Sequence, residues 1–184
     1  MHDLLHTAAS TPSSWVTRFA PLIASGGAIL DYACGSGRHA RWLAQRGFRV
    51  EAVDRDGIAL QLLQGLPKVT TCEADLEGET WPYAGRQFDA VVVTNYLYRP
   101  YLGHLLTVLR PGGVLIYETF MLGNERFGKP SNPEFLLRPN ELLERLRGDW
   151  TIAAFEQGEV HAPRPAMVQR VCAVRGQAAT LVLP

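Results

Sequence analysis

The sequence predicts a single α/β domain built on a doubly wound, mostly parallel sheet of seven strands. Between about residues 28 and 120, short apolar runs typical of buried strands alternate with amphipathic runs typical of helices. This alternation indicates parallel strands joined by helices that cover both faces of a sheet. Two further strand-like runs, at 150–157 and 167–174, have no helix between them. They predict an antiparallel C-terminal hairpin at one edge of that sheet.

Hydrophobic periodicity and turn residues place the individual elements. A first helix is expected over 13–24, with Ser13 or Ser14 as its N-cap and with Pro21 able to end it early. The stretch 121–138 is rich in glycine and proline and predicts a long irregular segment. The remaining strands are expected at 28–33, 48–53, 68–74, 88–94 and 114–120, and the remaining helices at 38–46, 57–64, 101–109 and 139–147.

Composition excludes several classes of protein. The 184 residues contain 18 Lys+Arg and 18 Asp+Glu, so the net charge is zero, which argues against a dedicated nucleic-acid binder. Cys34, Cys72 and Cys172 lie far apart, which predicts neither a disulfide framework nor a zinc site, and we expect no metal. No signal peptide or membrane span is indicated. A cytoplasmic protein with no membrane partner is therefore expected.

The loop after the first strand carries the first chemical signal. The small residues Ala33, Gly35 and Gly37 let the chain turn tightly and let a ligand approach the backbone at the start of a helix. The next strand ends in Asp54, near the offset of about 20 residues at which a carboxylate accepts from ribose hydroxyls. Together these residues predict a cofactor that contains a nucleoside.

Two cofactors compete for this loop. The run Gly35-Ser36-Gly37-Arg38-His39-Ala40 satisfies the dinucleotide pattern G-x-G-x-x-A, so NAD is a rival. Asp31 ends the first strand, where its negative charge would oppose a pyrophosphate and would favour a ligand that carries an ammonium group. The charge of Asp31 therefore makes NAD a weaker candidate than a cofactor that carries an ammonium group.

At these residues the chain resembles class I S-adenosylmethionine-dependent methyltransferases, which have a Rossmann-like sheet. The family's first loop is matched by Ile29 through Gly37. Its later motifs are matched by Ala74-Asp75-Leu76, by Phe88-Asp89-Ala90-Val91-Val92 and by Leu109-Arg110-Pro111-Gly112-Gly113. Ala33 replaces the first loop glycine, a common variation. The resemblance covers about residues 28–120 and implies S-adenosylmethionine as the cofactor.

The resemblance also implies roles for individual residues. Asp31 would face the positive groups of the cofactor, and Asp54, followed by Arg55, would take the ribose diol. Asp75 would accept from the adenine amino group, while the N–H of Leu76 faces the ring. The cofactor-binding set that we expect is Asp31, Ala33, Gly35, Gly37, Asp54, Arg55, Asp75, Leu76 and Asn95.

The acceptor site is expected at the ends of the fourth and fifth strands. Family members that methylate exocyclic amines of bases carry an Asn/Asp-Pro-Pro-Tyr/Phe tetrad there, and Asn95-Tyr96-Leu97-Tyr98 lacks both prolines. Asn95 could bind cofactor or substrate through its amide, and Tyr96 and Tyr98 could wall the methyl group, unless one of them only packs the helix. Glu118 is the best-placed further carboxylate. The catalytic set that we expect is Asn95, Tyr96, Tyr98 and Glu118.

The segment 121–138 follows Glu118 and is interpreted as a lid over an acceptor pocket that includes Phe127. The run from Glu118 to Leu143 resembles small bacterial enzymes grouped with tellurite-resistance methyltransferases. The domain then divides into an N-terminal helical cap (1–27), a cofactor-binding core (28–120), the lid segment, and a helix plus hairpin (139–184).

The predicted function is transfer of a methyl group from S-adenosylmethionine to an unidentified acceptor. The acceptor is expected to be a small molecule because little chain remains for a recognition domain. We expect a monomer or homodimer that binds no nucleic acid. Two alternatives stay open: an NAD(P)-binding oxidoreductase, and a methyltransferase-like subunit without catalytic activity.

Overall fold

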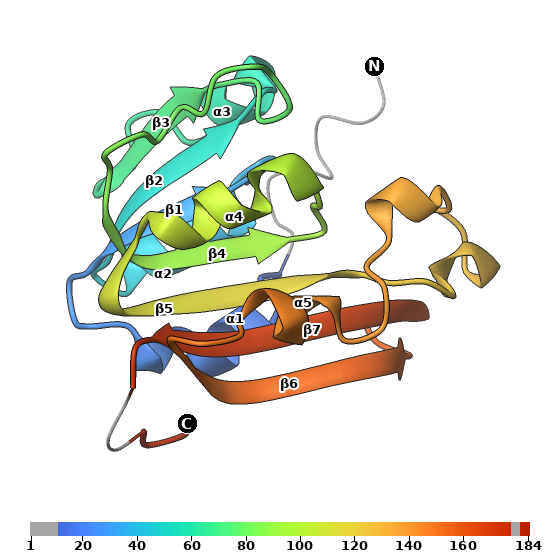
Figure 1. Cartoon of the computed structure of the whole chain (residues 1–184). Helices are drawn as coiled ribbons and strands as arrows, with labels where there is room; N and C mark the ends of the chain where they lie inside the picture. The colour runs from blue at the N-terminus through green and yellow to red at the C-terminus, as the bar shows by residue number, and fades with distance from the viewer. Residues whose placement is uncertain (1–10, 178–180) are drawn as a thin grey trace.

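The computed structural model describes residues 11–177 and 181–184, and in them a seven-stranded sheet in the order β3-β2-β1-β4-β5-β7-β6 (Figure 1). The predicted fold class is confirmed: β1 to β5 run parallel, and β7 and β6 close one edge antiparallel. The strands are β1 (Ala28–Tyr32), β2 (Arg49–Asp54), β3 (Val69–Glu73), β4 (Phe88–Thr94), β5 (Leu109–Phe120), β6 (Trp150–Val160) and β7 (Ala166–Arg175).

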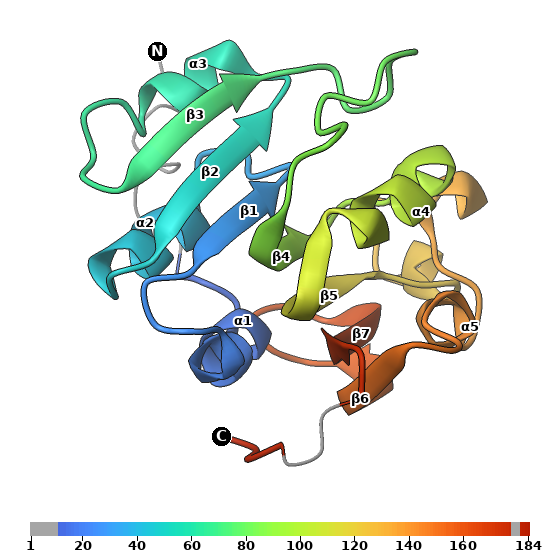
Figure 2. The same cartoon turned by 60° about the vertical axis from the view of Figure 1, so that its left-hand side comes forward.

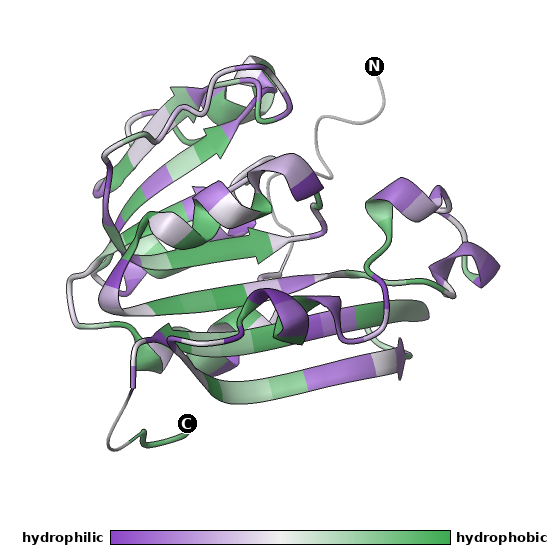
Figure 3. Cartoon of the chain, viewed as in Figure 1, coloured by the Kyte–Doolittle hydropathy of each residue, from purple (hydrophilic) through white to green (hydrophobic). Residues whose placement is uncertain are grey.

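Helices cover both faces of the sheet (Figures 1 and 2). The α-helices are α1 (Ser14–Phe19), α2 (Arg38–Gln45), α3 (Gly57–Gln61), α4 (Arg99–Thr107) and α5 (Glu141–Arg145). One hydrophobic core lies between the sheet and α1 to α3, and it includes Trp15, Phe19 and Leu43. A second core lies on the other face, with Leu102 and Leu142 from α4 and α5. The central strand β4 is accordingly hydrophobic along most of its length in Figure 3.

The chain between β3 and β4 forms no helix; instead, residues 74–87 cross the sheet as turns. Aromatic rings cover the sheet face there. The Trp81 ring centroid lies 5.2 Å from that of Tyr101, 5.8 Å from that of Tyr83 and 5.9 Å from that of Tyr32. This cluster covers the sheet face that a crossover helix would otherwise cover. Aromatic packing of this kind buries a large apolar area with few residues.

Proline positions explain where two helices differ from their predicted bounds. Ser13 caps α1 by accepting from the Trp15 N–H, but α1 ends at Phe19 and a 3₁₀ turn of Ala20–Leu22 follows, because Pro21 cannot continue the α-helix. Helix α4 begins two residues earlier than expected, with Pro100 in its first turn, where an N–H is not needed.

The segment 121–138 is held firmly to the rest of the fold. Arg99 Nε and Nη2 donate to the two carboxylate oxygens of Glu141 at 2.8 and 2.9 Å, while Arg99 Nη1 and Nη2 donate to the carbonyls of Glu134 and Leu136. Leu136 and Leu137 are buried, and the buried Asn124 side chain donates to the Pro130 carbonyl and accepts from the Met167 N–H. One arginine thus joins α4, this segment and α5.

We predict that Glu141→Gln destabilises the protein by about 2–3 kcal/mol, because Arg99 and the Arg138 N–H lose a carboxylate partner that is 2% exposed. Burial alone would raise the pKa of Glu141, but the hydrogen bonds from Arg99 and Arg138 lower it from 4.5 to about 2. The carboxylate therefore stabilises the fold fully above pH 4.5, and this contribution is lost as the pH falls toward 2.

Urea unfolding at pH 7 and pH 3 measures this difference. The gap between wild type and Glu141→Gln should narrow at pH 3, and the exposed Glu144→Gln on the same helix should cost less than about 0.5 kcal/mol. A gap that is equal at both pH values would show that the charge of Glu141 does not hold the segment.

Candidate active site

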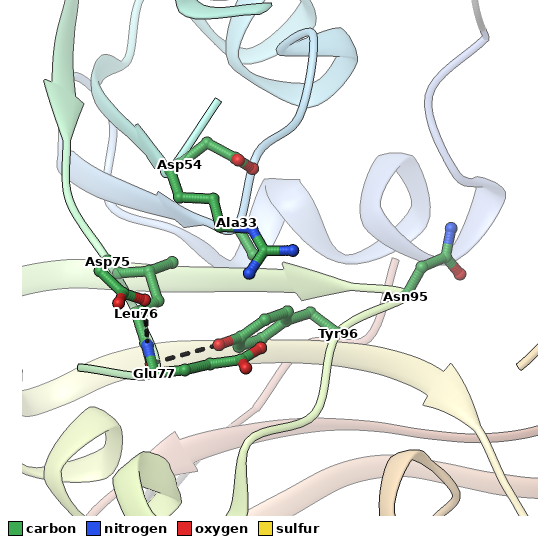
Figure 4. A pocket seen from close by; sticks show the side chains of 8 residues that line it. Ala33, Asp54, Asp75, Leu76, Glu77, Asn95 and Tyr96 are labelled. Atoms are coloured by element: carbon green, nitrogen blue, oxygen red, sulfur yellow. Dashed lines mark hydrogen bonds between the residues drawn. The ribbon is translucent and has the colours of Figure 1, made fainter. Parts of the chain in front are cut away.

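A cavity of about 240 Å³ opens at the carboxyl ends of β1, β2 and β4 (Figure 4). Parallel pairing aligns these ends, since Tyr32 lies opposite Val53 of β2 and Val93 of β4. Ligands of open α/β sheets bind at this edge. The lining residues are Ala33, Asp54, Arg55, Asp75, Leu76, Glu77, Asn95 and Tyr96, seven of which are expected site residues.

Asp54 is fixed in place by backbone donors. Its Oδ2 accepts from the Gly35 N–H at 2.7 Å and its Oδ1 accepts from the Asp56 N–H at 3.0 Å. Each carboxylate oxygen keeps a second lone pair that can accept from a ligand hydroxyl. Asp54 therefore joins the loop after β1 to the end of β2 and still presents an acceptor to the cavity.

The loop after β1 has the backbone geometry of a ligand cradle. Ala33 and Gly35 both have positive φ, at 56° and 54°, and a Cβ added at Gly35 would meet no atom within 4 Å. Gly37 has another role, because a Cβ there would lie 2.4 Å from Leu63 Cδ1. Gly37 lets α2 start close to Leu63 and does not line the cavity.

Asp31 is buried at the end of β1 and does not line the cavity. Its Oδ2 accepts from the Ala40 N–H at 2.9 Å, and no ion pair of the described residues includes it. Burial raises the pKa of Asp31 from 3.8 to about 7, against the lowering effects of the Ala40 N–H and of Arg38. A positive group brought to Asp31 would favour its charged form.

Three tyrosines hold the strip of chain that follows Asp75. The hydroxyls of Tyr96 and Tyr98 donate to the carbonyls of Leu76 and Glu77, each at 3.2 Å, and the Tyr101 hydroxyl donates to the Gly78 carbonyl. The hydroxyls of Tyr96 and Tyr98 are thus committed to the backbone. Burial, followed by nearby Tyr32 and Glu77, raises the pKa of Tyr96 above its ordinary range, so this phenol stays protonated.

A second cavity of about 200 Å³ adjoins the first. Three residues line both cavities: Glu77, Asn95 and Tyr96. The other lining residues of the second cavity come from the end of β4, the end of β5 and the segment 121–138. They are Leu97, Thr119, Phe120, Pro130 and Phe135.

Two of the expected catalytic residues, Tyr98 and Glu118, line neither cavity. Tyr98 turns toward Tyr101, with ring centroids 5.3 Å apart. Glu118 is engaged elsewhere, because its Oε1 accepts from the Ser13 hydroxyl at 2.7 Å and its Oε2 accepts from Arg170 at 3.1 Å. Phe127 is exposed and does not line the second cavity, where Phe120 and Phe135 supply aromatic rings instead.

Glu77 is the site residue that sequence reasoning missed. It follows Asp75 and Leu76 in a turn without periodicity, and only its position two residues after Asp75 could have indicated it. Its backbone is fixed on both sides, since its N–H donates to Asp75 Oδ1 at 3.0 Å and its carbonyl accepts from Tyr98. Its carboxylate makes no ion pair with any described residue.

Two nucleophilic or basic groups near the loop are buried. Burial, then nearby Asp31 and Asp54, raises the pKa of Cys34 above its ordinary range, so its thiol fills space. Burial and Arg38 lower the pKa of His39 to about 3, and His39 Nε2 accepts from the Ser13 N–H.

Within residues 11–177 and 181–184, no group of three or more His, Cys, Asp or Glu side chains lies close enough together to hold a metal ion. No helix in the same ranges has the length and apolarity to cross a membrane.

Comparisons with known proteins agree with this geometry. Residues 29–113 match the family model of a methyltransferase domain. A search of curated proteins found no match to the sequence. Many solved structures share the fold.

Three of these structures show the range of similarity. TehB from Haemophilus influenzae is 19% identical with a TM-score of 0.74; the match covers 92% of this chain but only 64% of TehB. A TehB-like methyltransferase from Corynebacterium glutamicum is 19% identical with a TM-score of 0.66, over 94% and 92% of the two chains. The Burkholderia thailandensis 1,6-didemethyltoxoflavin N1-methyltransferase, solved with its substrate and S-adenosylhomocysteine, is 20% identical with a TM-score of 0.63, over 95% and 82%.

Neither alternative from the sequence, an oxidoreductase or a subunit without activity, finds support in these comparisons. Two of the similar structures, the Burkholderia thailandensis enzyme and a magnesium protoporphyrin IX methyltransferase from Synechocystis, were solved with bound S-adenosylhomocysteine. The chain has the Rossmann-like fold of the solved methyltransferases, and its residues 29–113 match the model of a methyltransferase domain.

Proposed function

We propose that this chain transfers a methyl group from S-adenosylmethionine, bound in the first cavity, to a small-molecule acceptor in the second. The observation that carries the proposal is that the two cavities meet at Glu77, Asn95 and Tyr96. A donor and an acceptor placed on either side of this junction would be held for an in-line reaction. Cavities of about 240 and 200 Å³ suit small molecules.

The residues of the first cavity fit the cofactor. Asp54 is proposed to accept from the ribose hydroxyls, Asp75 from the adenine amino group, and Leu76 to pack on the ring. The open space above Gly35 leaves room for a ligand against the backbone. Asp31 is proposed to interact with the ammonium group of the methionine portion. Arg55 and Asn95 contribute the remaining polar groups of this cavity.

The cofactor supplies a methyl group that is already activated by a sulfonium. The protein therefore has two tasks, to align the acceptor and to exclude water. Phe120 and Phe135 are suited to the second task, because they bring apolar surface to the acceptor cavity. We further propose that residues 121–138 act as a wall of the acceptor site, with Pro130 and Phe135 as its contacts.

The other proposals follow the sequence analysis. The parts of the domain are the N-terminal cap, the cofactor core, the lid segment and the closing hairpin, with residues 1–10 of the cap outside the described residues. We propose a monomer or homodimer that works in the cytoplasm without nucleic acid, because the equal numbers of acidic and basic residues provide no field for a polyanion.

We predict that S-adenosylhomocysteine raises the melting temperature of the protein and binds measurably in calorimetry, whereas NAD does not. Asp54→Ala should weaken this binding at least tenfold, because a fixed carboxylate that accepts from ribose is removed. Glu73→Gln is the matched control, since Glu73 lies opposite Asp54 on β3 and lines neither cavity. Unchanged affinity in Asp54→Ala would contradict the ribose assignment.

We predict opposite effects of Asp31→Asn on stability and on binding. The raised pKa of Asp31 means that folding favours its protonated form, so stability is lost as the pH rises from 3.8 through about 7. The variant removes this cost, and its melting temperature at pH 8 should rise by about 2–6 °C. Its binding of S-adenosylhomocysteine should fall about tenfold.

Melting curves at pH 5 and pH 8, with and without S-adenosylhomocysteine, measure both effects. The gain in stability should be smaller at pH 5, where Asp31 is mostly protonated. A variant that binds S-adenosylhomocysteine as tightly as wild type would show that Asp31 does not contact the ammonium group.

A further inference from the structure

The charges around the junction of the two cavities are uneven. Three carboxylates, from Asp54, Asp75 and Glu77, and one guanidinium, from Arg55, line the first cavity. Glu77 is the one charged residue of the second cavity, whose other walls are apolar, hydroxyl or amide groups. Both cavities therefore lie in a negative local field, although the net charge of the chain is zero.

Among the described residues that line the second cavity, none is Lys or Arg, and two arginines of neighbouring elements are paired elsewhere. Arg99 is paired with Glu141 and donates to two carbonyls of the segment 121–138. Arg170 is paired with Glu118 and Glu156. Arg164 is exposed, with its Cζ 5.9 Å from the Phe120 ring centroid, and does not line the cavity. An anionic acceptor in the second cavity would therefore meet Glu77 with no cationic side chain among the lining residues.

Glu77 is held where it can act on an acceptor. Its backbone is fixed by Asp75 and Tyr98, while its carboxylate lies beside the Tyr96 ring in Figure 4. Tyr96, Phe120 and Phe135 bring aromatic rings to the same cavity. A carboxylate next to aromatic rings suits an amine on a flat apolar body, because the carboxylate and the ring faces both attract a cation.

We propose, resting on the methyltransferase function above, that the acceptor is a small amine with an aromatic or similarly flat apolar body, and that Glu77 selects it. An oxyanion such as tellurite, which the resemblance to tellurite-resistance enzymes raises, does not fit this cavity. Glu77 attracts the ammonium form and accepts hydrogen bonds from the nitrogen.

The chemistry balances without any further reactant. The amine first gives up its ammonium proton to solvent or Glu77, which frees the nitrogen lone pair. That pair forms the new N–C bond while the C–S bond breaks and its electron pair stays on sulfur as a neutral thioether. The methylated nitrogen carries the positive charge, which it loses by releasing a proton to Glu77 or to solvent.

The test measures binding of three ligands with one skeleton, 2-phenylethylamine, 2-phenylethanol and 3-phenylpropionate, to the protein saturated with S-adenosylhomocysteine. We expect the amine to bind most tightly and the carboxylate most weakly. With S-adenosylhomocysteine kept at a saturating concentration for each variant, Glu77→Gln should weaken binding of the amine about three- to tenfold. Glu79→Gln is the matched control, because Glu79 is exposed on the same loop and lines neither cavity.

Two further measurements test whether Glu77 selects the amine. Glu77→Lys should reverse the preference, so that 3-phenylpropionate binds more tightly than the amine. Incubation of wild type with S-adenosylmethionine and each ligand, or tellurite, followed by mass spectrometry, should show methylation of the amine alone.

Equal binding of amine and carboxylate by wild type, equal effects of Glu77→Gln and Glu79→Gln, or methylation of tellurite in preference to the amine would overturn the inference. Absence of S-adenosylhomocysteine binding contradicts instead the proposed function, so the two failures are distinguishable. Unfolding curves without ligand confirm that each variant folds.

Discussion

The parallel register of β1, β2, β4 and β5 is the constraint on which the site depends. Because these strands run in one direction, their carboxyl ends lie at the same edge of the sheet. The loops that follow them therefore bring Ala33, Asp54 and Asn95 to one cavity, although 62 positions separate the first from the last. A substitution that shifts this register would move the residues of the cavity apart, even if it replaced none of them.

The two cavities carry a negative local charge although the chain is neutral, because three carboxylates and a single guanidinium line them and other arginines are paired elsewhere. Arg99 is committed to Glu141 and Arg170 to Glu118 and Glu156, whereas Asp75 and Glu77 make no ion pair among the described residues. The same arginines hold the segment 121–138 and the hairpin in place. Because Arg99 and Arg170 are used in structural ion pairs, neither of them pairs with the carboxylates of Asp75 and Glu77 at the cavities.

The sequence was informative where a residue's role depends on its place at a strand end. Asp54, Asp75 and Asn95 lie at or within two residues of the ends of β2, β3 and β4, and all three line the cavity as expected. Glu118 lies near the end of β5, but Ser13, 105 positions away, and Arg170, 52 positions away, engage its carboxylate. Strand-end position cannot show partners that approach from so far along the chain.

The sequence also could not predict which residues of the irregular segments line a cavity, for another reason. Phe135 lines the second cavity, and Phe127 does not, because Arg99 fixes the carbonyls of Glu134 and Leu136 on either side of Phe135. Such an anchor leaves no periodic pattern in the sequence. Gly37 is similar, since its close approach to Leu63, where an added Cβ would lie 2.4 Å from Cδ1, leaves no pattern in the sequence.

Between β3 and β4 the chain forms turns and no helix, and the hydroxyls of three tyrosines hold it there. A crossover helix would fix the chain after Asp75 through its own hydrogen bonds, but a run of turns cannot. Hydroxyls of Tyr96, Tyr98 and Tyr101 hold three successive carbonyls of that run, and Trp81 packs beneath on Tyr101. Tyr96 and Tyr98 therefore also position the chain, because their hydroxyls fix the carbonyls of Leu76 and Glu77, while the side of Tyr96 that remains lines both cavities.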